Sequence, residues 1–376
     1  MKVLVAMSGG VDSSVAAARM VDAGHDVVGV HLALAPKSTG AGGSKGCCTI
    51  EDARDARRVA DRLGIAFYVW DMAAEFRAAV IDDFLEAYQV GRTPNPCMRC
   101  NERIKFAAVL DRAIALDFDA VATGHYARIV QSSDGPQLFR GADPLKDQSY
   151  VLGMLQSDQL ARTLLPLGND DKPVVRAEAE QRGLLVAAKP DSHDICFIPD
   201  GDTAGFLRRR LDLQPGPIID AQTGEDIGTH QGASTYTIGQ RRGLGHTSGG
   251  ERRYVVDVIL RSPEHGGADV VVTGPPTLLD VSVLLGGSVT WTNQPTSDIE
   301  CLAQVRAHAP AVPATAHFDP IEGRLTVGLH EPIRGVAPGQ SVVLYDGERV
   351  VGSAIIESTQ AADTGAAQAL GNAFRG

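Results

Sequence analysis

The segment KVLVAMSGGVDSS, residues 2–14, carries the clearest structural signal in this chain of 376 residues. Residues 2–7 are an apolar run that predicts a short buried strand, and residues 15–23 then predict a helix. Two glycines between them let the backbone approach an anion closely, and the helix start offers unpaired N–H groups and a positive dipole. Three serine hydroxyls add donors, and Asp12 could hold Mg²⁺ against phosphate oxygens. The segment therefore predicts a phosphate-binding turn.

Strand and helix patterns alternate outward from this turn. Strands are predicted at 27–34, 66–69 and 120–123, and helical stretches at 50–63, 73–90 and 102–116. This alternation indicates parallel βαβ units in an open, doubly wound sheet, so the fold class of the N-terminal part is α/β. In such sheets ligands bind at the carboxyl ends of the strands.

The pattern changes near residue 205. Residues 214–250 are rich in Gly, Pro and Thr, and alternating β-branched runs dominate from residue 253 onward. Asp346-Gly347, between two such runs, predicts a two-residue hairpin turn. The C-terminal hundred or so residues are therefore predicted to form a small β-barrel, followed by a flexible Ala/Gly-rich tail.

Composition limits the classes of protein that fit. With 44% hydrophobic and 22% charged residues, the chain is neither collagen-like nor wholly disordered, and no stretch is long enough to span a bilayer. The first apolar run is too short for a secretory signal, which predicts a cytoplasmic location where cysteines stay reduced. The net charge of −11 weighs against nucleic-acid binding, but residues 206–260 hold seven arginines against six acidic residues. Their arginine clusters are available to phosphates, or form an ordinary solvated face.

The cysteines are few, and two of them stand in a distinctive context. Cys97 and Cys100 lie in TPNPCMRCN, where prolines stiffen the approach to the helix predicted at 102–116. Cys100 is thus predicted at or near a helix N-terminus, whose dipole favours the thiolate. Cys196 follows a polar turn and, taken alone, reads as a small buried apolar residue. Two distant reactive cysteines feeding one ATP site would instead indicate sulfur transfer, with a persulfide on one and disulfide exchange by the other.

A Cys-x-x-Cys pair also fits half of a zinc site, and a third cysteine would allow an iron–sulfur cluster with one open position. Zinc requires a second pair of ligands at close spacing, and the sequence has no second Cys-x-x-Cys. Zinc is therefore the weaker of the two metal interpretations. Cys301, in an apolar strand-like run, is interpreted as structural.

Several motifs carry a resemblance to known proteins. SGGVDSS resembles the loop of the pyrophosphate-loop ATPases, which cleave ATP between the α and β phosphates and adenylate a carbonyl-type oxygen. The longer motifs resemble the tRNA-specific 2-thiouridylase family, whose members thiolate the wobble uridine of tRNA. They are AMSGGVDSS (6–14), TPNPCMRCNERIKF (93–106), ATGHYAR (122–128), LKDQSYVL (145–152), DSHDICFIPDGD (191–202), GTHQGASTYTIGQRRGLG (228–245) and APGQSVVLYDGERVVGSAII (337–356).

This resemblance implies an architecture. A catalytic pyrophosphate-loop domain would occupy residues 1–205, a central tRNA-contacting domain 206–277, a β-barrel 278–360 and the tail 361–376. The residues implied for ATP are Ala6, Met7, Ser8, Gly9, Gly10, Val11, Asp12, Ser13, Leu32 and Gly124. Those implied for tRNA are His125, Lys146, Asp147, Gln148, Arg306 and Gln340.

It also implies a chemistry. Cys100 matches the family's nucleophile and Cys196 its persulfide carrier, with a Cys100–Cys196 disulfide left after transfer. The implied cofactor is ATP with Mg²⁺, the partners are tRNA and a cysteine desulfurase or relay protein that donates sulfur, and no membrane is involved. Cys97 stands where the best-known members carry an Asp proposed as acid/base. A thiol could move the same proton, or Cys97, Cys100 and Cys196 could hold a [4Fe-4S] cluster.

Parts of this sequence are also compatible with two other classes of function. A small-molecule amidating ligase could use the same loop, but it leaves the cysteines and the all-β half without a role. A nucleotide-binding module with a structural metal site accounts for the cysteines but not for LKDQSYVL or IGQRRG.

Overall fold

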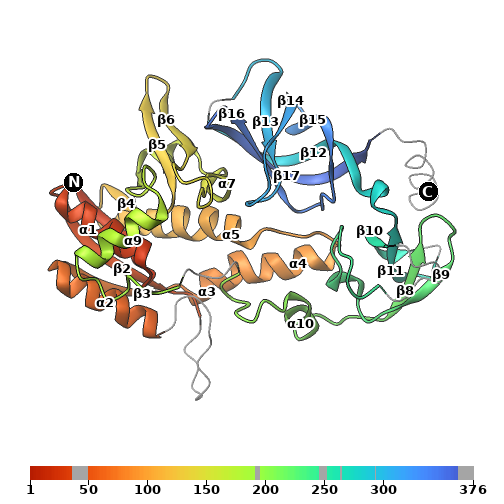
Figure 1. The fold of residues 1–376 in the computed structure, drawn as a ribbon, viewed down its shortest axis with the longest axis horizontal. Helices are drawn as coiled ribbons and strands as arrows, with labels where there is room; N and C mark the ends of the chain where they lie inside the picture. Colours follow the sequence, from red (N-terminus) through yellow and green to blue (C-terminus); the bar gives the residue numbers. More distant parts are fainter. Residues whose placement is uncertain (36–49, 191–194, 245–251, 263–264, 293, 363–376) are drawn as a thin grey trace.

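The computed structural model describes residues 1–35, 50–190, 195–244, 252–262, 265–292 and 294–362. Figure 1 shows an α/β domain at the N-terminal end of the molecule, with a β-barrel and a smaller central sheet at the other end. The predicted loop at 36–46, Cys47, Cys48 and most of the predicted tail lie outside the described residues. The domain limits at 205, 277 and 360 stay predictions.

The N-terminal sheet is parallel, as predicted. Its five strands stand in the order β3-β2-β1-β4-β7. They are β1 (Lys2–Ala6), β2 (Asp26–Ala33), β3 (Ala66–Asp71), β4 (Ala120–Ala122) and β7 (Thr163–Leu164). Because alternate residues of β1 point to opposite faces, Val3 and Val5 join one apolar core while Leu4 joins the other.

Helices cover both faces of this sheet, which confirms the doubly wound fold. One face packs against α1 (Val11–Asp22), α2 (Ile50–Leu63) and α9 (Lys172–Gln181). The other packs against α3 (Ala73–Phe76), the π-helical η1 (Arg77–Asp82), the π-helical η2 (Cys100–Ala108) and α6 (Val109–Ala115). The helix α4 (Asp83–Gln89) continues η1, and α5 (Pro96–Arg99) precedes η2 and packs through Met98 against a cluster that includes barrel residues. No helix in the described part of the chain is long and apolar enough to cross a membrane.

The helix that carries Cys100 begins earlier than predicted. Asn95 caps its first turn, because its Oδ1 accepts from the backbone N–H of Cys97 at 3.1 Å and of Met98 at 3.2 Å. Pro96 occupies the first helical position, where its fixed φ and missing N–H suit a helix start. The sequence predicts a stiff approach over these residues and Cys100 at or near the N-terminus of the helix that follows. The helix instead starts at Pro96, so Cys97 lies in its first turn and Cys100 follows one turn later, at the start of η2.

The C-terminal part is a closed barrel, as predicted. Its strands run in the order β12-β15-β14-β13-β16-β17, and β17 pairs again with β12. They are β12 (Asp280–Trp291), β13 (Ile299–Gln304), β14 (Val312–Asp319), β15 (Arg324–Arg334), β16 (Ser341–Asp346) and β17 (Arg349–Ala361). The hairpin between β16 and β17 exists, but Asp346 pairs with Arg349, so the two-residue turn is Gly347-Glu348.

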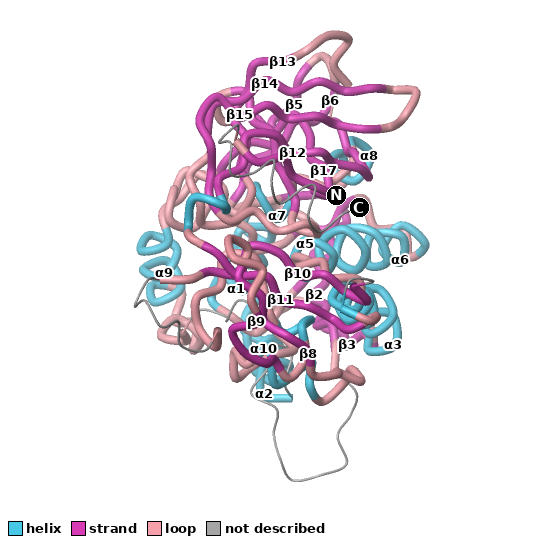
Figure 2. The backbone as a smooth tube through the Cα atoms, turned by 90° about the vertical axis from the view of Figure 1, so that its right-hand side faces the viewer, coloured by secondary structure: helices cyan, strands magenta, loops and turns pink. Residues whose placement is uncertain are grey.

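A hairpin from the α/β domain extends the barrel sheet. Strands β5 (Ala127–Ser132) and β6 (Gly135–Arg140) pair with each other, and Phe139 of β6 pairs with Arg349 of β17. Figure 2 shows this hairpin grouped with the barrel strands at the top of the molecule. Two distant parts of the sequence thus share one sheet.

A smaller element lies at the end of the molecule opposite the N-terminal sheet (Figure 1). Its sheet has the order β10-β11-β8-β9, from β8 (Gly216–Asp220), β9 (Asp226–His230), β10 (Tyr254–Ser262) and β11 (Ala268–Gly274). The remaining short helices are α7 (Ser149–Leu152), α8 (Ser157–Ala161), α10 (Thr203–Arg208), η3 (Ala233–Thr235) and η5 (Pro276–Leu279).

Candidate functional site

The glycine loop lies between β1 and α1, at the carboxyl edge of the parallel sheet. Gly9 adopts φ +81°, and a Cβ at this position would lie 2.2 Å from the carbonyl oxygen of Asp52. Only glycine fits, because the backbone is left-handed and the start of α2 approaches too closely for a side chain. Ser13 Oγ accepts from the Ser8 N–H at 3.1 Å and donates to the Gly10 carbonyl at 3.2 Å, which closes the loop on itself.

The end of β4 packs directly onto this loop. A Cβ on Gly124 would meet the Asp12 carbonyl carbon and the Ser13 nitrogen, each at 2.7 Å. Of the residues predicted to bind ATP, Gly124 therefore lies directly against Asp12 and Ser13, although more than a hundred residues separate them in sequence.

Two lysines that sequence analysis missed reach into the loop. Lys172 Nζ lies 2.7 Å from both carboxylate oxygens of Asp12. Lys189 Nζ donates to the Gly9 carbonyl at 2.9 Å and pairs with Asp52 at 2.7 Å and Asp55 at 2.9 Å. Burial opposes charge on Lys189, but its hydrogen bonds to the two aspartates outweigh that effect and raise its pKa. The loop therefore has nearby ammonium groups, although its own sequence has no lysine. The one local signal was the placement of each lysine just before a proline.

The position of Lys172 is secured by an ion-pair network between α9 and α1. Arg19 on α1 pairs with Asp170 at 2.5 Å and with Glu178 at 2.6 Å. Glu178 also accepts from Arg182 at 2.9 Å. These contacts fasten α9 to the last turn of α1, and Lys172, the first residue of α9, reaches the loop with its side chain.

Asp12 was the predicted Mg²⁺ ligand. Besides Lys172, its Oδ1 accepts from the Tyr126 hydroxyl at 2.7 Å. Among the described residues, no group of three or more His, Cys, Asp or Glu side chains is arranged to hold a metal ion. A cation bound by Asp12 would therefore compete with Lys172 for the same oxygens.

The cysteines meet on the opposite face of the sheet from α1. Cys100 is buried in an apolar cluster that also contains Leu32, at the end of β2, and Cys196 packs against the same cluster. Leu32 was the residue predicted beside adenine. The fold thus places Cys100 and Cys196 in one apolar cluster, although ninety-odd residues separate them in sequence. Cys97 is half-buried at the start of α5.

The other cysteine predictions have different outcomes. Cys97, Cys100 and Cys196 do not form, within the described chain, a group that could hold a metal ion, so the [4Fe-4S] alternative has no support in this geometry. The Cys100–Cys196 disulfide stays a prediction. Cys301 is half-buried in β13, and burial raises the pKa of its thiol to about 11, in keeping with a structural role.

His125 follows β4 and is buried, with its ring 5.8 Å from that of Phe106. Its Nδ1 lies 2.7 Å from Thr123 Oγ1, and Lys105 Nζ lies 3.5 Å from its Nε2. Burial lowers the pKa of His125 well below its ordinary value, and the Lys105 charge adds to the effect. The ring is therefore neutral at pH 7.

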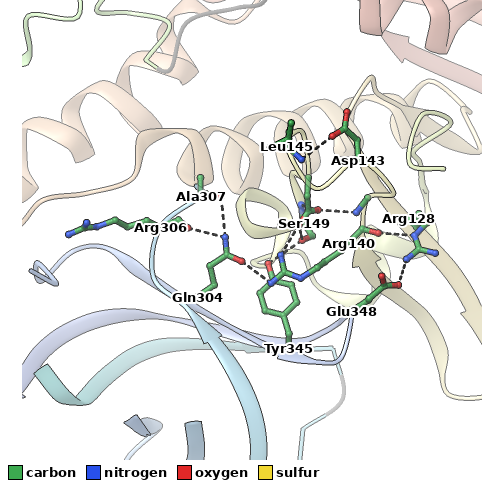
Figure 3. Close-up of polar contacts among 12 residues, drawn as sticks. Arg128, Arg140, Asp143, Leu145, Ser149, Gln304, Arg306, Ala307, Tyr345 and Glu348 are labelled. Atoms are coloured by element: carbon green, nitrogen blue, oxygen red, sulfur yellow. Dashed lines mark hydrogen bonds and ion pairs between the residues drawn. The ribbon is translucent and has the colours of Figure 1, made fainter. Parts of the chain in front are cut away.

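Two of the residues predicted to face tRNA make contacts inside the protein. Asp147 pairs with Arg140 at 2.8 Å and accepts from the Ser149 hydroxyl at 2.9 Å. Gln148 Oε1 accepts from the Tyr126 N–H at 2.9 Å. Figure 3 shows the network around Arg140, whose guanidinium lies 3.7 Å from the centre of the Tyr345 ring and donates to Gln304 at 2.9 Å. These contacts hold the β5–β6 hairpin against the barrel.

The remaining predicted tRNA residues are spread more widely. Lys146 is half-exposed in the same turn, and Arg306 is exposed on the barrel, where it donates to the Gly335 carbonyl. Gln340 lies before β16, and its Nε2 donates to the Thr93 carbonyl at 2.6 Å. The contact of these six residues with tRNA stays a prediction.

Comparisons with known families divide the chain into three. The family described as tRNA methyl transferase HUP domain matches residues 1–200. The tRNA methyl transferase PRC-barrel domain matches residues 204–264, and the aminomethyltransferase beta-barrel domain matches residues 281–356.

Curated relatives match nearly the whole chain. A tRNA-specific 2-thiouridylase of Frankia casuarinae is 57% identical, over 96% of this chain and 99% of its own. That of Acidothermus cellulolyticus is 57% identical over 97% and 100%, and that of Streptomyces coelicolor 55% over 98% and 97%.

Solved structures are more distant. A 4-thiouridine synthetase–RNA complex with bound ATP aligns at a TM-score of 0.35 and 18% identity, covering 53% of this chain and 45% of that one. An NMN synthetase from Francisella tularensis aligns at 0.32 and 16%, covering 51% and 66%.

Proposed function

Because the chain belongs to the tRNA-specific 2-thiouridylase family, we propose that it uses ATP to replace the C2 oxygen of the wobble uridine of tRNA with sulfur. The observation that carries this proposal is the apolar cluster shared by Leu32, Cys100 and Cys196. Membership of one cluster is consistent with Cys196 acting as the sulfur carrier and Cys100 as the second thiol, and Leu32 of that cluster lies near the carboxyl end of β2, where a parallel sheet binds its ligands.

Activation comes first. The C2 oxygen of uracil is a poor leaving group, so it attacks the α-phosphorus of ATP and pyrophosphate departs. Loop N–H groups at the start of α1 and the nearby Lys172 ammonium would stabilise the charge on that pyrophosphate. If Mg²⁺ binds at Asp12, it supplies further charge neutralisation.

Sulfur transfer follows at the cysteines. The terminal sulfur of a persulfide on Cys196 attacks C2 and displaces AMP, which leaves C2 joined to Cys196 through two sulfurs. The Cys100 thiolate then attacks Sγ of Cys196, breaks that sulfur–sulfur bond and releases 2-thiouridine. The resulting Cys100–Cys196 disulfide needs two electrons from an external thiol reductant before the next cycle. Cys97, one turn from Cys100, would move a proton in this sequence.

Base extrusion is required for this chemistry, because the C2 oxygen of a stacked nucleotide cannot reach an enclosed site. Arg208, Arg241 and Arg252 are among the cations of the central segment that would bind the tRNA backbone. The sulfur donor would be a cysteine desulfurase or a relay protein that loads Cys196.

The test is thiolation by the purified protein with tRNA, ATP and a persulfide donor, followed by nucleoside mass spectrometry. Cys196→Ala and Cys100→Ala are expected to abolish 2-thiouridine, while tRNA-dependent release of pyrophosphate from ATP persists in both, because adenylation precedes both thiol steps. AMP release that responds to small amines but not to tRNA would overturn the proposal.

A second measurement separates the persulfide from cluster chemistry. Anaerobically purified protein is analysed for iron and sulfide, with Cys97→Ala and Cys196→Ala as controls. A cluster that thiolation requires, and that both substitutions remove, would contradict the persulfide route.

A further inference from the structure

The segment before Cys100 is held by the barrel. Thr93 N–H donates to the Pro338 carbonyl at 2.7 Å, and Gln340 Nε2 donates to the Thr93 carbonyl at 2.6 Å. Both polar groups of one backbone residue of the α/β domain are thus bound by one barrel segment. We call residues 338–341 the clamp.

The clamp is built for close approach. Gly339 adopts φ +93°, and a Cβ there would lie 2.9 Å from the Thr93 nitrogen and 3.0 Å from Arg92 Cβ. Any other residue would push the two segments apart. Ser341 adds a further contact, because its carbonyl accepts from the buried Tyr150 hydroxyl at 3.0 Å. Tyr150 also interacts with the Asn95 side chain, so the clamp reaches the helix cap by a second route.

The chain between Thr93 and Cys100 has few soft torsions. Pro94 and Pro96 have fixed φ angles on either side of Asn95, and Asn95 in turn caps the helix that starts at Pro96. Cys100 follows after a single turn of that helix. A displacement at Thr93 therefore passes to Cys100 with little absorbed on the way.

There is room for such a displacement. A cavity of about 300 Å³ lies between this segment and the barrel, lined by Arg92, Pro94, Asn95, Met98, Gly339 and Ser341 among others. Without the Gln340 hydrogen bond, the segment could move into this space rather than stay in one position.

We propose that Gln340 is a positioning residue through which the barrel holds Cys100 in place for sulfur transfer. This inference rests on the proposed role of Cys100, and it assigns Gln340 a task inside the protein in place of the tRNA contact that the family resemblance implies. The barrel thereby becomes part of the catalytic apparatus as well as a substrate-binding element.

The test uses the full chain and Gln340→Met, which keeps the length of the side chain but removes the donor. Gln294→Met, at an exposed position between β12 and β13, is the matched control. At saturating tRNA, single-turnover thiolation by Gln340→Met is expected to slow by roughly three- to tenfold, the loss of about one hydrogen bond, with tRNA affinity unchanged.

The second readout needs neither tRNA nor ATP. Alkylation of Cys100 by iodoacetamide is expected to accelerate, by roughly three- to tenfold, because a looser segment exposes this buried thiol more often. Trypsin separates the two thiols, since cleavage after Arg92, Arg99 and Arg103 puts Cys97 in TPNPCMR and Cys100 in CNER. Gly339→Ala, which forces the segments apart sterically, is expected to change both rates in the same directions.

Two outcomes would overturn the inference. One is an unchanged alkylation rate of Cys100 in both variants, with their folding verified by thermal unfolding. The other is weaker tRNA binding as the sole effect of Gln340→Met. If the wild-type protein thiolates no tRNA, the proposed function fails, while the alkylation comparison still decides whether the clamp holds Cys100.

Discussion

Lys172 and Asp12 form an ion pair across 160 residues of sequence, with the Lys172 ammonium 2.7 Å from both carboxylate oxygens. The lysine side chain is only 9% exposed, whereas that of Asp12 is 31% exposed. A buried ammonium is stable only with a partner. The pair therefore holds the Lys172 ammonium group at the glycine loop before any substrate arrives.

Lys172→Met is expected to impair ATP cleavage by tenfold or more, because charge on departing pyrophosphate loses its nearby cation. The free energy of unfolding should fall by about 1–3 kcal/mol, less than for a fully buried pair because water reaches Asp12. Pyrophosphate release and urea unfolding measure the two effects. Lys2→Met, at the opposite end of β1, is the control, and equal effects of both substitutions would contradict a role at the loop.

Gly9 and Gly24 make a matched pair for testing the crowding at the loop. Both have positive φ, +81° and +76°, but a Cβ at Gly24 meets nothing within 4 Å. Gly24→Ala should therefore cost about 1 kcal/mol from backbone strain alone. Gly9→Ala should cost at least twice that and abolish ATP binding, since the Asp52 carbonyl must move. Calorimetric titration with ATP and urea unfolding check both, and equal losses in the two variants would show that crowding contributes nothing.

His125 gives the protein a pH-dependent stability. Burial lowers its pKa from 6.5 to well below that value, so the unfolded chain binds a proton that the folded protein excludes. The contribution of the neutral His125 ring to the free energy of unfolding is therefore fully present above about pH 6.5 and is lost as the pH falls below that value. His125→Asn should therefore make the fall of the free energy of unfolding between pH 7.5 and 5.5 shallower, as measured by urea unfolding. An unchanged pH profile would show that the ring is charged in the fold.

Arg140 is expected to contribute more to the free energy of unfolding than an exposed arginine does. Its partner Asp147 has a side chain only 8% exposed, and Arg140 also stacks on Tyr345. Arg140→Met should lower the free energy of unfolding by about 2–4 kcal/mol, since it leaves a buried carboxylate without its cation. Arg324, paired with Glu322 on the surface, is the control, and its replacement by Met should change stability by less than about 0.5 kcal/mol. Similar losses would refute the role of this network in joining hairpin and barrel.

The main architecture could be predicted from the sequence because that architecture depends on local patterns. The apolar run before the glycine loop, the strand–helix alternation and the β-branched runs after residue 253 all report backbone preferences within a few residues. The start of the helix at Pro96 was misjudged, because the cap at Asn95 resembles an ordinary proline-rich approach. The hairpin turn was placed one residue early for a similar reason, since the pairing of Asp346 with Arg349 decides it.

The sequence by itself determined the phosphate loop and the family. A glycine turn before a helix binds anions through its own backbone, and the motifs that define the family are contiguous strings. Only the tertiary structure decided which charges serve that loop and what holds Cys100. Lys172 reaches Asp12 across 160 residues, and Gln340 reaches Thr93 across 247. Such contacts depend on how α9 packs on α1 and how the barrel docks on the α/β domain. No local preference of a lysine or a glutamine encodes that packing.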